Sequence, residues 1–284
     1  MLSDAVSVLC CPVCQGPLTL KEDPKHALVC GLGHSFDSAK QGYFNLLTGK
    51  GTVFEADSAD MVTARQGFLD SGHYRALAAL IAELAGQALA GPRSVVIDAG
   101  TGTGYYLRSI LDRTPARAIG LDISKFALRR AARLNPEAVN IVWDVWRRLP
   151  IADNAADVLM VVFAPRNPAE FARVLRPGGT LIIVTPRPGH LAEVAARTGM
   201  LEIEEGKADR LADTLRGHFS PSSSHTLDIA LELDPTELAD LAFMGPAGHH
   251  LDRRVLAHAA GSDDKVAATA MFQISVFTAP DSGS

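Results

Sequence analysis

The residues best able to do chemistry lie around a glycine-rich stretch, SVVIDAGTGTGYY at 94–106. An apolar, β-branched run ends at Asp98, and Gly100, Gly102 and Gly104 follow at alternate positions. Such glycines let a ligand approach the backbone closely. A dinucleotide fingerprint would need a glycine where tyrosine stands at position 105, and a P-loop would need a lysine after Gly104. The stretch therefore favours a different cofactor.

Three acidic residues follow the apolar runs that we predict to be neighbouring strands. Asp98 is placed to meet a cationic amino-acid end, Asp122 in GLDIS to hold ribose hydroxyls, and Asp144 in VWDVW to contact an adenine. The carboxyl ends of parallel strands meet at one edge of a sheet, where ligands bind. Together with the glycines, these acids indicate S-adenosylmethionine. Taken singly, the glycines fit a tight turn, Asp122 a helix N-cap and Asp144 a solvated loop acid.

All four cysteines lie within the first thirty residues, in CCPVCQGPLTLKEDPKHALVCGLGH. In a reducing compartment this clustering indicates metal binding rather than disulfides. Cys11 pairs with Cys14 at short spacing, and Cys30 pairs with His34, which is the spacing of a structural, tetrahedral Zn²⁺ site. Cys10 competes with Cys11, but the Cys-Pro-x-Cys knuckle favours Cys11. The alternative is a set of four buried free thiols.

Strand and helix patterns alternate in the part of the chain that must position these residues. Apolar runs predict strands at 94–98, 116–123, 140–143, 156–164 and 180–186, with helices between them. This alternation is typical of a doubly wound, Rossmann-like α/β sheet. We also expect helices at 58–72, 74–90 and 168–179, the last ending at Pro-Gly-Gly. An antiparallel strand pair is expected at 225–233 and 269–279 around a helix at 235–244, with SPSSSH at 220–225 as a loop.

The composition narrows the class of protein. The 284 residues are 47% hydrophobic and carry a net charge of −5, so any contact with nucleic acid needs a local basic patch. The N-terminus lacks a basic region ahead of an apolar core, and the longest apolar stretch, ALAALIAELAGQALA, is too short to cross a bilayer. We expect a cytoplasmic protein whose partners include neither a membrane nor DNA.

Along nearly the whole chain, these segments resemble the RlmA-type large-subunit rRNA guanine-N1 methyltransferases. The likeness lies in the cysteine cluster and in GHSFDSAKQGYFNLL, DMVTARQGFLDSGHY, the glycine stretch, LDISK and VLRPGGTLIIVTPRPGHL. The segment DVWRRLPIADNAADVLMVVFAPRNP is more similar to the tylosin-resistance branch of actinobacteria than to the enterobacterial branch. The resemblance implies a class I S-adenosylmethionine-dependent methyltransferase sheet with an N-terminal zinc ribbon. It also implies a homodimer that methylates guanine N1 in the loop of hairpin 35 of 23S rRNA, with macrolide resistance as a further expectation.

The resemblance assigns roles to individual residues. The implied zinc ligands are Cys11, Cys14, Cys30 and His34. The implied cofactor contacts are Tyr74, Gly102, Thr103, Asp122 and His190, to which the strand-end argument adds Asp98, Gly100, Gly104 and Asp144. The chain would then comprise a zinc-ribbon RNA-recognition module at 1–50, a helical connector that contributes to the cofactor site at 51–92, and a methyltransferase domain at 93–284.

This sequence departs from the family pattern in two places. Thr103 stands where the enterobacterial branch has a glutamate, which changes the group near the cofactor's amino end. MGPAGHHL lacks a tryptophan found in relatives, so a base-stacking role would fall to Phe243, His249 or His250, or the contact is absent.

The expected reaction is an in-line attack by guanine N1 on the sulfonium methyl, with FAPRNP at 163–168 beside the acceptor. The sequence does not assign a general base. Residues available for phosphates are Lys40, Lys50, Arg65, Arg75, Arg147, Arg148 and Arg166. Two alternatives stay open: a small-molecule methyltransferase of the same fold, and a zinc-ribbon RNA-binding protein with a vestigial cofactor fold.

Overall fold

A computed structural model of the chain describes residues 2–22, 26–49, 52–198, 211, 213–245, 248 and 265–281. Its main feature is one eight-stranded sheet. The order across this sheet is β10 (Ser220–Leu233), β11 (Val266–Thr278), β9 (Leu175–Pro186), β8 (Ala156–Val162), β5 (Val95–Ala99), β6 (Arg117–Asp122), β7 (Val139–Val142) and β4 (Phe44–Asn45). The strands from β9 to β4 are parallel, whereas β11 runs antiparallel to both β9 and β10. The doubly wound α/β sheet and the late antiparallel pair are therefore confirmed.

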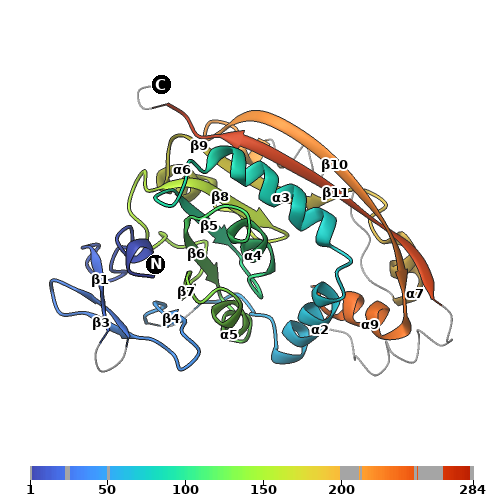
Figure 1. The fold of residues 1–284 in the computed structure, drawn as a ribbon, viewed down its shortest axis with the longest axis horizontal. Coiled ribbons are helices and arrows are strands. Elements are labelled where there is room, and N and C mark those ends of the chain that lie inside the picture. Colours follow the sequence, from blue (N-terminus) through green and yellow to red (C-terminus); the bar gives the residue numbers. More distant parts are fainter. Residues whose placement is uncertain are drawn as a thin grey trace.

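Helices cover both faces of this sheet (Figure 1). They are α1 (Leu2–Val6), α2 (Ala59–Asp70), α3 (Arg75–Ala88), α4 (Tyr105–Leu111), α5 (Lys125–Leu134), α6 (Pro168–Val174), α7 (Ala192–Thr198) and α9 (Pro235–Phe243). Because side chains alternate along a strand, Ile97 joins the core cluster that contains α1 and α6, and Val96 joins the cluster that contains α3 and α4. Burial on both faces explains why the central strands are almost entirely apolar.

The N-terminal region shares its core with the large sheet. Its own small antiparallel sheet consists of β1 (Leu18–Lys21), β2 (Ala27–Cys30) and β3 (Ser35–Asp37). Leu9, Phe44 and Leu46 are buried in the same cluster as the residues of β5 and β6, and β4 extends the large sheet by pairing with β7. Figure 1 shows this region, in blue, beside the β7 end of the sheet. Residues 2–49 are thus packed onto the sheet rather than attached to it by a linker.

Two local predictions were wrong. The helix expected at 168–179 ends at Val174, and Leu175 begins β9, where it pairs with Ala156 of β8. Pro177 disfavours helical backbone at the residue before it, so the chain extends and pairs with its neighbour instead. SPSSSH at 220–225 is not a loop but the start of β10, which pairs with the end of β11. Its polar composition reflects an exposed edge strand rather than a turn.

No helix within the described ranges is long and apolar enough to cross a membrane.

Candidate cofactor and zinc sites

The glycine loop, residues 100–104, leads from β5 into α4 with a left-handed backbone at each of its three glycines. A Cβ at Gly100 would lie 2.2 Å from the Cβ of Ala164, and one at Gly104 would lie 2.5 Å from Nδ2 of Asn135. Packing within the protein therefore requires these two glycines. A Cβ at Gly102 would meet only Arg65, at 3.7 Å. Of the three, Gly102 is the glycine whose backbone is open to a ligand.

Asp122, at the carboxyl end of β6, holds this loop in place. Its Oδ2 accepts a hydrogen bond from the Gly102 N–H at 2.9 Å, and its Oδ1 accepts one from the Ser124 N–H at 2.8 Å. Burial raises the pKa of Asp122 above its usual value. The N-cap of α5 is Ser124 rather than Asp122. A carboxylate oxygen can accept more than one hydrogen bond, so Asp122 retains acceptor capacity for ribose hydroxyls.

Asp98, at the end of β5, is a buried acid that lacks a counter-charge. It is 1% exposed, and neither carboxylate oxygen has a hydrogen-bond partner among the described residues. Burial, together with the negative charge of Asp122, raises the pKa of Asp98 to about 7, although the nearby Thr101 hydroxyl acts in the opposite direction. An unpaired buried carboxylate is costly unless a cation or donor reaches it. The arrangement therefore fits a ligand with a cationic amino group beside the glycine loop, which is what S-adenosylmethionine offers.

Asp144, just beyond β7, is buried rather than solvated. Its Oδ2 accepts a hydrogen bond from the Thr52 hydroxyl at 2.7 Å, and its Oδ1 accepts one from the Trp146 N–H at 3.0 Å. The Ser124 hydroxyl, beside Asp122, donates to the Asp57 carbonyl at 2.9 Å. The segment 52–57 thus lies over the strand ends that carry Asp122 and Asp144, and it belongs to the expected connector.

Tyr74 and His190 both contact the ring of Phe272 in an aromatic cluster. Each ring centroid is 5.0 Å from that of Phe272, and Tyr74 also contacts Phe68 edge-on. Tyr74 is buried, which raises the pKa of its hydroxyl. Nδ1 of His190 faces the backbone N–H and C=O of Met271, and burial lowers its pKa to about 4, so the ring is neutral at physiological pH. Among the described residues, no hydrogen bond joins Tyr74 or His190 to the glycine loop.

Thr103, which is buried, completes the set of predicted cofactor residues. Thr103, Gly100, Gly102, Gly104, Asp98 and Asp122 all lie at the carboxyl ends of β5 and β6, with Asp144 beyond β7.

The segment 163–168, which we expect to lie beside the acceptor, begins with an aromatic residue to which the sequence analysis assigned no individual role. Phe163 follows β8 with a left-handed φ of +56°, and its side chain is 46% exposed. This backbone is strained for an aromatic residue, and such strain concentrates at functional sites. The Phe163 ring centroid lies 6.5 Å from that of Tyr106, in the first turn of α4 after the glycine loop, and 5.6 Å from that of Phe272. An aromatic residue that ends a buried strand just before Ala-Pro is the signal that could have found it.

The proposed stacking residues near the C-terminus are a different case. Phe243 is buried with Met61 and Ala64 and offers no free ring face, so a base-stacking role for Phe243 is not supported. His249 and His250 lie outside the described residues.

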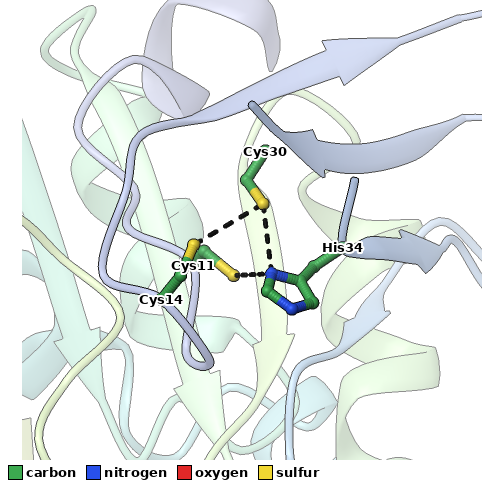
Figure 2. A group of neighbouring side chains, drawn as sticks. All are labelled: Cys11, Cys14, Cys30 and His34. Carbon is green, nitrogen blue, oxygen red and sulfur yellow. Dashed lines mark hydrogen bonds between the residues drawn. The ribbon is translucent and has the colours of Figure 1, made fainter. Parts of the chain in front are cut away.

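The N-terminal cluster brings together Cys11, Cys14, Cys30 and His34 (Figure 2). Their ligand atoms all lie within 4.8 Å of one another. The Cys14 Sγ–Cys30 Sγ distance is 3.6 Å, and Nδ1 of His34 is 3.6 Å from Sγ of Cys11 and 3.3 Å from Sγ of Cys30. Tetrahedral Zn²⁺ ligands at about 2.0–2.3 Å from the metal lie about 3.5–3.8 Å from one another. The four side chains therefore fit a structural zinc ion.

Tight turns preorganise this cluster. The Cys11 N–H donates to the Gly16 carbonyl and the Gln15 N–H to the Cys11 carbonyl, which closes the first knuckle, and the Cys30 N–H donates to the His34 carbonyl in the second. Burial alone would raise the pKa of the Cys30 thiol, but hydrogen bonds from the backbone of Leu32 and His34 and from neighbouring side chains lower it to about 6. Cys10 lies outside the cluster, and burial raises its pKa.

Three of the seven basic residues proposed for phosphates have polar partners within the protein, and Arg75 is exposed. Arg65 pairs with Asp57 and donates to the Met244 carbonyl, and Arg148 contacts Gln15 and Asp153. Arg147 lies 3.9 Å from Asp144, and burial lowers the pKa of Arg166. Lys40 is exposed, whereas Lys50 lies outside the described residues.

Comparison with known proteins covers both parts of the chain. A family model described as "RlmA, N-terminal" matches residues 9–49, and one described as "Methyltransferase domain" matches residues 96–179. A protein of Streptomyces fradiae named 23S rRNA (guanine(748)-N(1))-methyltransferase is 44% identical over 259 residues, covering 90% of this chain and 91% of its own. A protein of Micromonospora griseorubida, also named as a 23S rRNA (guanine-N(1)-)-methyltransferase, is 44% identical over 96% of this chain and 98% of its own.

Among solved structures, the YcgJ protein from Bacillus subtilis superimposes with a TM-score of 0.51 at 15% identity, covering 72% of this chain and 98% of that one. This likeness supports the fold alone.

Proposed function

The chain belongs to the family of 23S rRNA (guanine-N1)-methyltransferases, and on that premise we propose that it methylates N1 of guanine 748 in the hairpin 35 loop of 23S rRNA. The observation that carries the proposal is the 44% identity to the Streptomyces fradiae enzyme, which extends over 90% of the chain and whose name specifies that guanine. The match to the N-terminal zinc ribbon distinguishes the chain from methyltransferases that share only the sheet.

Four groups of this chain suit S-adenosylmethionine, which supplies an electrophilic methyl group on a sulfonium sulfur. The unpaired carboxylate of Asp98 binds the amino end, and the open backbone at Gly102 lets the ligand lie close to the loop. Asp122 would accept hydrogen bonds from the ribose hydroxyls. Asp144 would accept one from the edge of the adenine, in partial exchange for the hydrogen bond that it receives from the Thr52 hydroxyl. These residues would hold the cofactor in one orientation, and positioning is the main contribution of the protein to such a displacement.

The guanine is held by residues that follow β8. The half-exposed ring of Phe163 offers a stacking surface for a base that has left the hairpin loop, and such a base costs little to extrude because its pairing is incomplete. Guanine N1 loses its proton as it gains the methyl group. The segment 163–168 contains no carboxylate and no imidazole, so the group that accepts this proton, a carboxylate, a histidine or a water molecule, lies outside that segment.

Primer extension on 23S rRNA tests the proposal directly. An N1-methyl group blocks base pairing, so reverse transcriptase should stop next to guanine 748 when the gene is expressed in a host that lacks this methylation. The purified protein should transfer a tritiated methyl group to a hairpin 35 RNA and not to the same RNA with adenine at position 748. A stop at another nucleotide, or equal labelling of both RNAs, would refute the assignment.

The two alternatives predict different results in the same assays. A small-molecule methyltransferase would bind S-adenosylmethionine and leave both RNAs unlabelled. An RNA-binding protein with a vestigial cofactor fold would bind the hairpin and show no heat of binding with S-adenosylmethionine.

Three further properties follow from the proposal and need their own tests. The enzyme acts in the cytoplasm, where its rRNA substrate is found, and fractionation of cells checks this. It forms a homodimer, which light scattering on the purified protein would detect. Methylation lowers susceptibility to tylosin-type macrolides, which growth assays with and without the gene would measure.

A further inference from the structure

α5 has an unusual charge for this protein. Its ten residues include Lys125, Arg129, Arg130 and Arg133 and no acidic residue, although the chain as a whole carries a net charge of −5. The sequence analysis did not include any of these four among the candidate phosphate-binding residues. A basic segment on an acidic protein is the local patch that binding to nucleic acid requires.

Three of the four basic residues lie on one exposed face. Lys125, Arg129 and Arg133 are spaced four residues apart, so they lie one above another about 6 Å apart along the helix axis. No ion pair joins them to an acidic residue in the part of the chain that the structure describes. The Arg129 guanidinium lies 5.2 Å from the ring centre of Phe126, which is itself exposed. We name Lys125, Phe126, Arg129 and Arg133 the α5 stripe.

The α5 stripe is unfavourable for the helix itself. Like charges four residues apart repel each other, and a lysine in the first turn opposes the helix dipole. Arg130, by contrast, donates to Gln66 and Thr63 and so braces α5 against α2. Arg130 therefore has a structural role, whereas Lys125, Arg129 and Arg133 form no ion pair within the described ranges.

The position of α5 connects the two functional sites. Its N-cap, Ser124, donates its N–H to Asp122, so the helix begins at the cofactor site. Ala132 lies next to Gly42 of the N-terminal region, and Tyr43 packs with Leu128. Figure 1 shows α5 between β4 and α2. A polymer bound along the stripe would extend from the cofactor site toward the zinc ribbon, whose Lys40 is exposed.

We infer that the α5 stripe is a docking surface for the phosphate backbone of the RNA substrate. The inference rests on the proposed function and specifies how the RNA is held. Three unpaired cations match a row of phosphates, and the Phe126 ring suits contact with an unpaired base. Docking here would hold the flank of the hairpin while one base of its loop enters the site near Phe163.

The test compares two triple variants with the same change in net charge. One carries Lys125→Ala, Arg129→Ala and Arg133→Ala. The control carries Lys265→Ala, Arg93→Ala and Arg197→Ala, which are exposed cations on other elements. The dissociation constant of hairpin 35 RNA is measured between 50 and 200 mM salt, together with the Tm of each protein and its affinity for S-adenosylmethionine.

Each lost phosphate contact reduces the salt slope of log K by about 0.7–0.9. The stripe variant should therefore show a slope smaller by about 2–3 and about tenfold or greater loss of affinity at low salt. Its affinity for S-adenosylmethionine should be unchanged, and its Tm should be equal or higher because the repulsion is removed. The control variant should keep most of the wild-type slope.

The possible failures are distinguishable. A wild-type protein that methylates the hairpin, with a stripe variant whose slope equals that of the control, would overturn this inference and leave the proposed function intact. A wild-type protein that neither binds nor methylates the hairpin would overturn both.

Discussion

At the scale of single residues, the buried acids Asp122 and Asp98 of the cofactor site differ in their hydrogen-bond partners. Asp122 already has two backbone N–H groups as partners, so it stabilises the glycine loop before any ligand binds. Asp98 has no hydrogen-bond partner among the described residues and keeps a pKa raised to about 7 by burial. Asp122 therefore stabilises the fold and can also bind the ligand, whereas Asp98 destabilises the fold when no ligand is bound. Such destabilisation is common where a site must bind a charged group.

We predict that Asp98→Asn stabilises the ligand-free protein and weakens cofactor binding. The pKa of Asp98 is about 7 in the folded state, whereas the ordinary pKa of an aspartate, which applies to the unfolded chain, is 3.8, so the folded state binds more protons between these values. Stability contributed by this group is therefore lost as pH rises from about 4 to 7. The Tm gain of Asp98→Asn should be larger at pH 8 than at pH 5, as measured by calorimetry.

Cofactor affinity should change in the opposite direction. Because an ionised Asp98 attracts the amino end of S-adenosylmethionine, wild-type affinity should rise between pH 6 and pH 8, and the variant should lose this rise. Asp122→Asn is the control. One of the two backbone N–H groups that donate to Asp122 would lose its acceptor oxygen, so this variant should have a lower Tm, in contrast to Asp98→Asn. An Asp98→Asn variant with wild-type affinity at every pH would contradict the assigned role.

At the scale of elements, the zinc ribbon depends on two tight turns, one at residues 11–16 before β1 and one at residues 30–34 between β2 and β3. These strands are only three or four residues long, and so small a sheet needs a metal to hold its turns together. Cys11 and Cys30 are both buried in the core cluster that also contains Ile119 of β6. The metal therefore fixes the surface on which part of the large sheet packs.

We predict one zinc ion per chain, lost in Cys14→Ser and retained in Cys10→Ser. Cys14 Sγ lies 3.6 Å from Cys30 Sγ, whereas Cys10 lies outside the cluster. Elemental analysis of the purified variants gives the ratio, and Cys10→Ser serves as the matched control because it also replaces one thiol. Loss of zinc from Cys10→Ser with retention in Cys11→Ser would show that the ligand set is wrong.

At the scale of the whole molecule, the N-terminal region and the sheet form one packed body. Phe44 is fully buried in β4, which pairs with β7, and Leu9 forms a bridge with Ile151. A protein cut at residue 50 would expose that core and one sheet edge, so truncation is a poor way to separate RNA recognition from cofactor binding. Point substitutions such as those in the α5 stripe leave the body intact.

We predict that Phe44→Ala destabilises the entire protein by about 3–5 kcal/mol, the usual cost of removing a buried phenylalanine side chain. The chain has two tryptophans, Trp143 and Trp146, and both follow β7. Their fluorescence therefore reports unfolding of the sheet in a urea titration. A single transition with a lower midpoint is expected, and exposed Leu32→Ala should leave the midpoint nearly unchanged. Two separate transitions would mean that the two parts fold independently.

The sequence by itself determined the features that local pattern encodes. Runs such as VVIDA and ADVLMVV are apolar on both faces, which a central parallel strand requires, and each acid of the site follows such a run. The ligand set was equally readable, because Cys-x-x-Cys and Cys-x-x-x-His spacings bring ligand atoms together across short turns. These signals span a few residues, so they need no knowledge of distant partners.

Only the tertiary structure decided the features that depend on distant neighbours. The two residues of β4 carry no periodic signal, and β4 exists because the edge of β7 offers backbone partners about a hundred residues away in sequence. Leu175 became strand rather than helix because β8 lies beside it. Within the described ranges, Asp98 has no hydrogen-bond partner, Phe163 is exposed and the α5 stripe has no acidic partner, and these too are facts about neighbours. Burial, pairing and charge compensation are properties of the packed chain, and no window of sequence contains them.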